Sequence, residues 1–446
     1  MHNWLEGVLK HHWDERWEYH KKACKAKDNA NSNDSEISNI SEENKDEDKS
    51  FQGGELPELK KQMLNHIRLK FDEVVVPQGI TRVPSNLGEA SHGKLKASKW
   101  HTLFAIFLPL ALPDFLVEDC KQEYSENHPW LTLLNFSALV QCTNIVTHKS
   151  VSKQDGQKFQ ESYEVYMKSS KLLFSNIHIN PNHHYALHLP QQMNWWGPLM
   201  AIAELSCECI NGVLQSFETN GQLGQIEDIV MRKFCQTQRM KVQEPFSAII
   251  QEKLDQNHSK QHPHKGIIDL NVYNAVLAEV QKTFPKMKDY RNTAPHQPNT
   301  KVLTRCATDM GSYKSPSGLY FSKMSPNVCV KFKKDGAVGY GWVVHVYKVE
   351  EAGTGGHDFV LLKKMGCGLK MDGMNPSATF LGFLNDMQLV LAINSNHFAV
   401  VRPQDITNVC AYQNLAAWTF GYRNPMVLIR PIQHDPRVVD PNLLPP

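Results

Sequence analysis

The sequence predicts an α+β protein in which a mainly helical region precedes a small antiparallel β barrel or sandwich. Two observations predict this class. Apolar residues recur at helical spacing through most of residues 56–282, and short runs of β-forming residues, several separated by glycine, follow from residue 326. The chain has 446 residues, of which 41% are hydrophobic, which is enough for two or three domains with their own cores.

The chain opens with a predicted amphipathic helix over 4–23, within a first unit of residues 1–24, because Trp4, Leu5, Val8 and Leu9 recur at helical spacing. Residues 25–55 are polar, and between 31 and 50 there are seven acidic residues against two lysines. Such a composition predicts a disordered acidic linker, with a solvated loop of no particular role as the alternative.

Residues 56–284 are predicted to form the helical region. Leu59, Met63, Ile67 and Phe71 lie four apart and define one amphipathic helix. A short irregular piece is expected between Pro181 and Pro190, because prolines interrupt helices. Further helices are predicted over 96–112, which is strongly apolar and expected to be buried, and over 129–147, 158–175, 201–217, 227–237, 246–256 and 272–282.

Residues 285–325 are rich in Pro, Ser, Thr and Asn and are interpreted as a linker. Residues 326–435 then form the predicted β domain, and 436–446 a tail. Six strands are expected, over 328–332, 339–349, 358–363, 387–391, 397–402 and 426–430.

Charge and hydropathy exclude several classes of protein. The net charge of +2 is unlike that of a histone-like chain. No apolar stretch of the secretory type follows Met1, and the best apolar run, 103–117, is too short for a bilayer and is broken by Pro109 and Pro113. Ten cysteines without a leader indicate reduced thiols. We therefore expect a nuclear or cytoplasmic protein that is not secreted and has no membrane partner.

Cysteine and histidine, the usual ligands of transition metals, cluster in two places. Cys207 and Cys209 are separated by a single residue, and the sequence contains no CxxC motif. A structural zinc site is therefore not expected there. His183, His184 and His188 form a cluster in which the last two, four apart, could share a helix face and bind a transition metal. The alternative is a helix start with ordinary packed histidines.

The predicted helix over 201–217 carries Glu204 and Glu208 one turn apart. Carboxylate oxygens suit Mg²⁺, so the pair is a candidate Mg²⁺ site, although an ordinary solvated face would show the same spacing.

Two basic stretches are candidate DNA contacts. The first, 231–241, carries Arg232, Lys233, Arg239 and Lys241. The second, 301–349, has eight Lys or Arg residues against Asp309 and Asp335. Cations in clusters bind phosphate, but both stretches could equally be solvated charge. No motif indicates a small-molecule substrate.

Three segments resemble transposases of CACTA-type DNA transposons, most closely the Plavaka-like elements of mushroom-forming fungi. They are LKASKWHTLFAIFLPLAL (95–112), NHHYALHLPQQMNWWGPLM (182–200) and AELSCECINGVLQSFETNGQLG (203–224). The opening MHNWLEGVLKHH is similar to the family's Met-His-Asn helix. The resemblance runs from residue 1 to about 240, without the acidic linker.

The resemblance implies a DDE transposase with an RNase H-like fold that a helical insertion interrupts. In that family three acids hold two Mg²⁺ ions for strand cleavage and transfer. The position matching the third acid is Glu208, with Glu204 as the nearby alternative. The helical region would then be the insertion and last helix of this fold.

The chain departs from the family pattern in ways that argue against catalysis. Cys209 follows Glu208 where relatives have arginine, and the two earlier aspartates are expected upstream of the Met-His-Asn helix, with most of the central sheet. Two hypotheses follow: a truncated, inactive transposase relic without a functional metal, or a non-catalytic DNA- or chromatin-binding protein derived from one. An active enzyme assembled with a separate upstream part is a third. Exposed apolar surface on helices 4–23 and 201–217 is expected to favour association.

Overall fold

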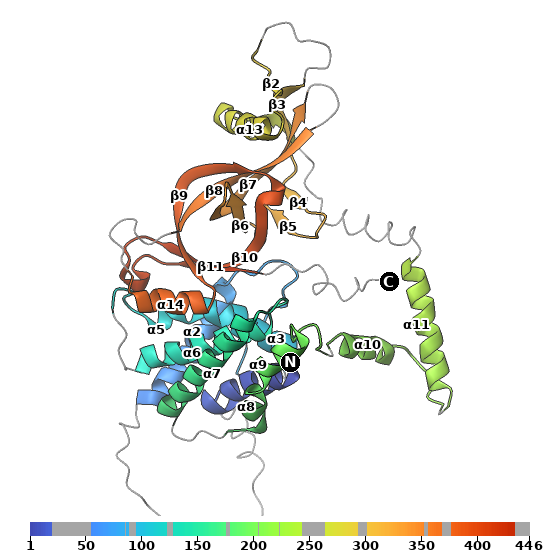
Figure 1. Cartoon of the computed structure of the whole chain (residues 1–446), viewed down its shortest axis with the longest axis vertical. Coiled ribbons are helices and arrows are strands. Elements are labelled where there is room, and N and C mark those ends of the chain that lie inside the picture. Colours follow the sequence, from blue (N-terminus) through green and yellow to red (C-terminus); the bar gives the residue numbers. More distant parts are fainter. Residues whose placement is uncertain are drawn as a thin grey trace, which may run out of the picture.

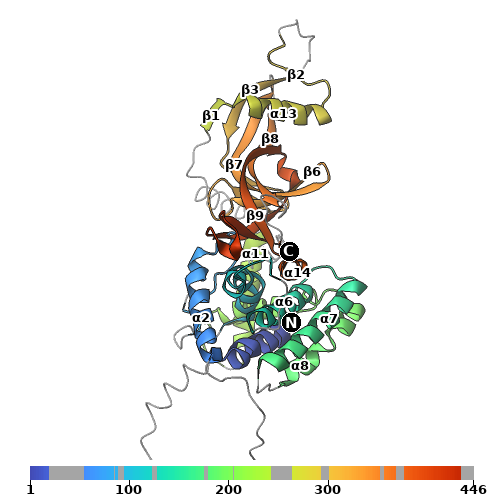
Figure 2. The same ribbon diagram turned by 90° about the vertical axis from the view of Figure 1, so that its left-hand side faces the viewer.

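Helices gather at one end of the molecule and a strongly curved antiparallel sheet lies next to them (Figure 1). Figure 2 shows the same order from the side, with α13 at the far end of the sheet. The α+β class is therefore confirmed. The computed structural model describes residues 1–19, 55–84, 86–88, 95–122, 128–174, 179–203, 205–222, 224–242, 264–292, 301–351, 356–367 and 376–432.

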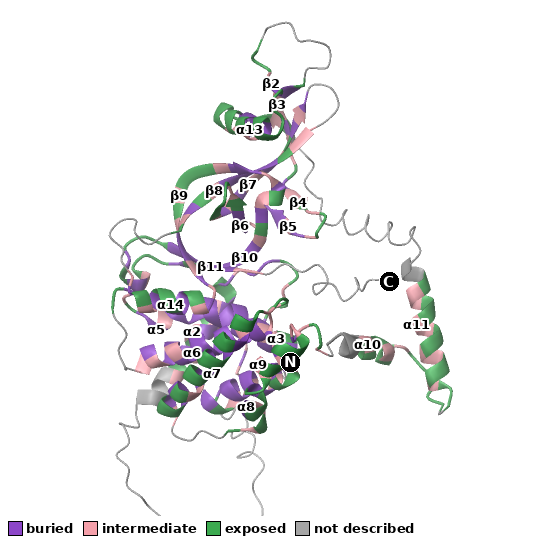
Figure 3. Ribbon diagram, in the orientation of Figure 1, coloured by how far each residue is buried: buried purple, intermediate pink, exposed green. Residues whose placement is uncertain are grey.

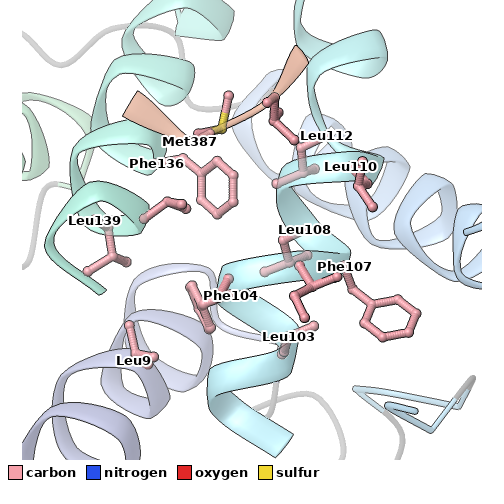
Figure 4. Close-up of a cluster of buried hydrophobic side chains, with 14 of the residues drawn as sticks. Leu9, Leu103, Phe104, Phe107, Leu108, Leu110, Leu112, Phe136, Leu139 and Met387 are labelled. Carbon is pink, nitrogen blue, oxygen red and sulfur yellow. The ribbon is translucent and has the colours of Figure 1, made fainter. Parts of the chain in front are cut away.

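The helical body surrounds one central helix, α6, which is buried on nearly all sides along most of its length. Side chains from the first helix, from η4 and α4 and from α6 converge at its centre together with Met387 (Figure 4). The elements of the body are η1 (Asn3–Leu9), η2 (His12–Arg16), α2 (Glu55–Glu73), α3 (Ala97–Thr102), η4 (Leu103–Phe107), α4 (Leu108–Ala111), α5 (Pro113–Leu116), α6 (His128–Val146), α7 (Lys153–Leu173), α8 (Pro181–Ala186) and α9 (Leu189–Trp196).

The first helix is shorter and much better packed than predicted. It ends at Arg16, and Glu18 follows with a positive φ of 59°, which a continuing helix does not allow. The expected exposed apolar face is wrong, because Trp4, Leu5, Val8 and Leu9 are all buried. A Cβ added at Gly7 would lie 2.5 Å from the side chain of Asn182, so this glycine permits the close approach of η1 to α8.

The expected irregular piece between Pro181 and Pro190 is also wrong. Both prolines stand in the first turn of a helix, where the missing N–H costs nothing. Asn180 caps α8 by accepting a hydrogen bond from the backbone N–H of His183. The prolines therefore start α8 and α9 and do not interrupt them.

Helix α7 begins at Lys153, five residues before its predicted start, because Ser152 and Asp155 form a capping box. Helices α10 (Leu205–Gln215) and α11 (Ile226–Val242) extend to the side of the helical body (Figure 1). Among their described side chains none is buried (Figure 3). Exposed apolar surface on the 201–217 helix is therefore observed, and association through it stays a prediction.

The main sheet has nine strands in the order β1-β3-β7-β6-β10-β11-β9-β8, with β2 beside β3. Because β8 also pairs with β7, six strands form a closed circuit of antiparallel neighbours. The strands of the main sheet are β1 (His264–Ile267), β2 (Lys288–Asp289), β3 (Val302–Asp309), β6 (Cys329–Lys334), β7 (Ala337–Glu351), β8 (Gly356–Cys367), β9 (Val390–Val401), β10 (Ile406–Leu415) and β11 (Met426–Pro431). A separate hairpin consists of β4 (Ser312–Lys314) and β5 (Tyr320–Ser322).

The predicted linker over 285–325 is wrong, because β2, β3, β4 and β5 lie within it. Helix α13 (Leu270–Thr283) belongs with these strands and not with the helical body, since Tyr273 and Val280 pack against Leu303, Phe359 and Val400. The β unit therefore begins by β1, well before residue 326. Its two predicted strands over 387–391 and 397–402 are one strand, β9, and helix α14 (Ala378–Asp386) precedes it without having been predicted.

The helical body and the sheet share a core. Leu391, Ala411 and Leu428 belong to the same buried cluster as α6. Val75 pairs with Tyr412 through two backbone hydrogen bonds of 2.9 Å. Arg430 on β11 donates from Nη2 to Oδ1 of Asn144 at 2.7 Å.

The predicted acidic linker, helix 246–256 and the tail 436–446 lie outside the described residues. Within the described part of the chain, no helix combines the length and apolar character needed to cross a membrane.

Candidate nucleic-acid interface

The candidate catalytic acids lie where the structure does not describe side chains. Glu208 lies in α10, but its side chain is outside the described set, as are Glu204 and the thiols of Cys207 and Cys209. Among described residues, no three His, Cys, Asp or Glu side chains are placed to hold a metal ion.

The basic residues of α11 are partly neutralised by their own surroundings. Arg232 forms an ion pair with Asp228 one turn away, and Lys233 donates from Nζ to the carbonyl of Glu218 at 2.6 Å. Arg239 is exposed, and the side chain of Lys241 lies outside the described residues. An exposed pair within one helix contributes little energy, so Arg232 remains available to phosphate.

The second basic stretch divides into two groups in the structure. Three of its lysines are held by acids: Lys301 by Glu351, Lys323 by Asp309 and Lys334 by Glu279. By contrast, no acid among the described residues forms an ion pair with Lys331 or Lys333 of this stretch, both on β6. The same holds for Lys363, which lies beyond the stretch on β8. These three lysines are therefore placed to bind an anionic partner.

The three lysines share one face of the sheet with large apolar side chains. Trp342 on β7 is the cross-strand partner of Lys363 on β8, and Lys363 is the partner of Phe398 on β9. Directly opposed residues in antiparallel strands point to the same side. Cys329 opposes Trp342, so Lys331 and Lys333 follow on that side with a period of two, and Val338 opposes Lys333. We call this set, Lys331, Lys333, Val338, Trp342, Lys363 and Phe398, the Trp342 face.

The two aromatic groups of the Trp342 face differ in exposure, and Trp342 is held in place against a buried cluster that includes Tyr412. Phe398 is 58% exposed. Trp342 is half-buried; its Nε1 donates to Oδ1 of Asn394 at 2.7 Å, and its ring meets that of Tyr412 edge to face at 4.7 Å. A ring fixed in this way loses little freedom when a base stacks on it. The face thus combines aromatic surface with unpaired positive charge.

The sequence reasoning did not identify Trp342, Lys363 or Phe398. The alternation in β7 was a usable signal, because it assigns Tyr340 and Trp342 to one side. The register that brings Lys363 and Phe398 beside Trp342 includes irregular steps in both β7–β8 and β8–β9 pairing, which no alternation pattern predicts.

The three candidate histidines separate into a buried one and an exposed pair. His183 contacts the hydroxyl of Tyr163 through Nδ1 at 3.0 Å, and Arg16 through Nε2 at 3.5 Å. Burial, and then the charge of Arg16, lower the pKa of His183 to about 3. It is therefore a neutral, packed histidine. His184 and His188 are exposed, with their Nε2 atoms 3.4 Å apart.

Comparison with protein-family models, curated proteins and solved structures found no match to this chain. What the structure itself defines is an α+β protein with a basic and aromatic face on its sheet.

Proposed function

We propose that this chain is a non-catalytic DNA-binding protein derived from a CACTA-type transposase, and that its Trp342 face binds single-stranded DNA. The cross-strand row of Trp342, Lys363 and Phe398 carries the proposal. Two exposed or half-exposed rings flank a lysine that has no acidic partner among the described residues. Bases stack on such rings whatever their sequence, while lysines follow the phosphates.

The transposase origin is supported by the ordered segments over 95–112, 182–200 and 203–224. In this proposal the helical body derives from the insertion of an RNase H-like domain, α10 from its last helix, and the closed circuit of strands is a small antiparallel barrel. The α11 cations Arg232, Lys233, Arg239 and Lys241 provide a second DNA contact.

Replacing Trp342 or Phe398 with alanine is expected to weaken binding of a labelled oligo-thymidine strand by roughly 5- to 150-fold, because stacking contributes about 1–3 kcal/mol per base. Replacing Lys363 with glutamine should lower the slope of log affinity against log salt by about 0.7, since one phosphate contact is lost. Fluorescence anisotropy over a salt series measures both.

Trp195→Ala is the matched control, because Trp195 is an exposed tryptophan of the helical body. Trp342→Phe should retain most of the affinity, which separates stacking from a folding defect. Equal affinities for wild type, Trp342→Ala and Phe398→Ala would contradict the assignment of this face, as would binding that is independent of salt.

A separate experiment tests the lack of catalysis. Purified protein incubated with Mg²⁺ and supercoiled plasmid, or with transposon-end duplexes, is expected to produce no nicks above background, and Glu208→Gln should behave as wild type. Mg²⁺-dependent nicking that disappears in Glu208→Gln would show an active DDE enzyme and would leave the DNA-binding assignment intact.

A further inference from the structure

His184 and His188 form an exposed imidazole pair at the junction of α8 and α9. Their Nε2 atoms are 3.4 Å apart, and the ring planes are inclined by 79°. His183, the residue before His184, points instead into the buried cluster with Arg16 and Tyr163. The chain therefore separates two adjacent histidines, one packed and one presented to solvent.

The separation of the two nitrogens matches that of two ligands on one metal ion. Zinc binds imidazole nitrogen at 2.0–2.1 Å in tetrahedral geometry, which places two such nitrogens about 3.3–3.4 Å apart. A hydrogen bond between two neutral imidazoles would also bring the nitrogens close. That bond requires one ring to donate its N–H and the other to accept it, which allows a single relative orientation. A metal ion uses both lone pairs at once.

The backbone holds the pair in this arrangement without any metal. The N–H of Leu187 donates to the carbonyl of His184, and the N–H of His188 to that of Tyr185, both at 3.1 Å, so the junction is a tight turn. Pro181 and Pro190 stand in the first turns of the helices on either side. A preorganised pair of ligands loses little conformational entropy on binding.

We infer that His184 and His188 form a binding site for a divalent transition metal of the zinc or copper class. Imidazole nitrogen suits these ions, whereas Mg²⁺ and Ca²⁺ prefer oxygen. Two imidazoles leave coordination positions open, which water or a donor atom of a bound molecule can fill. The site lies at the junction of two helices and is separate from the Trp342 face on the sheet.

The test uses the full chain with its accessible thiols alkylated, since Cys235 and Cys367 are exposed and thiols also bind zinc. Calorimetric titration with ZnCl₂ should show a one-to-one step that is lost in His184→Asn and in His188→Asn. The step should be retained in His397→Asn, a change at an exposed histidine of β9. CuCl₂ should bind more tightly than ZnCl₂.

Imidazole proton resonances provide a second measurement that does not depend on heat. Substoichiometric ZnCl₂ should shift or broaden the signals that are missing in the two variants and leave those of His397 unchanged. Zinc binding that persists in both variants, or resonances of His184 and His188 that do not respond to zinc, would contradict the site. Circular dichroism checks that the variants remain folded.

Discussion

Replacing Trp4 with alanine is expected to lower the free energy of unfolding by about 3–5 kcal/mol, the usual cost of removing a buried tryptophan. The side chain is 2% exposed and packs edge-on against Phe159 at 5.4 Å between ring centroids. Its Nε1 also donates to Oγ1 of Thr143 on α6 at 3.2 Å, a bond that alanine removes. Urea titration followed by circular dichroism measures the loss.

Trp195→Ala is the control for this prediction, because Trp195 is 64% exposed. A surface substitution of this kind changes stability by less than about 0.5 kcal/mol. Trp4→Phe should lose less than Trp4→Ala, since it keeps part of the ring contact. If Trp4→Ala and Trp195→Ala were equally mild, the first helix would not be part of the core of the helical body.

Lowering the pH from 7 to 5 is expected to destabilise the protein through its buried histidines. The pKa of His183 is lowered to about 3, first by burial and then by Arg16, whereas the unfolded residue titrates near its ordinary value of about 6.5. Between these values the unfolded state binds a proton that the folded state does not. The free energy of unfolding therefore falls as the pH drops below about 6.5, by about 2 kcal/mol at pH 5 from His183 alone.

His12 acts in the same direction, because full burial, followed by the charge of Arg16, lowers its pKa well below the ordinary value. In His183→Gln, which keeps an acceptor for Arg16, the loss of stability between pH 7 and pH 5 should be smaller than in wild type by about 2 kcal/mol. His397→Gln, a change at an exposed histidine of β9, is the matched control. An identical pH dependence in wild type and His183→Gln would show that His183 is not held neutral.

The spacing of apolar residues correctly predicted the helices that are buried because their own side chains are apolar. The spacing of Met63, Ile67 and Phe71 predicted α2, and all three are buried. The continuous apolar run over 96–112 predicted the buried segment that α3, η4 and α4 form. These elements follow from side chains that have no favourable exposed position.

Local composition was misleading where one residue type has two structural meanings. Pro181 and Pro190 indicated an interruption, yet each is compatible with the first turn of a helix, and only the cap on Asn180 and the neighbouring packing select that role. The polar residues around β3 indicated a linker, yet Leu303 and Ala307 are buried beneath α13. A short strand obtains its stability from neighbours that are distant in sequence.

The candidate sites were likewise predicted in part from the sequence and in part revealed only by the structure. Lys331 and Lys333 belong to a stretch whose excess of positive charge is evident from the sequence, and the spacing of His184 and His188 predicted a shared face. Which lysines are neutralised by acids, which rings lie beside Lys363, and which of the three histidines is buried depend on strand register and helix packing.

The sequence by itself determined that this protein is α+β, where most of its helices lie, and that positive charge gathers in its second half, because these properties depend on composition and on the periodicity of each segment. The tertiary structure alone decided that the first helix is buried, that the sheet begins before residue 285, and that Trp342, Lys363 and Phe398 lie side by side. Those outcomes depend on contacts between residues far apart in the chain, whose energies no local pattern contains.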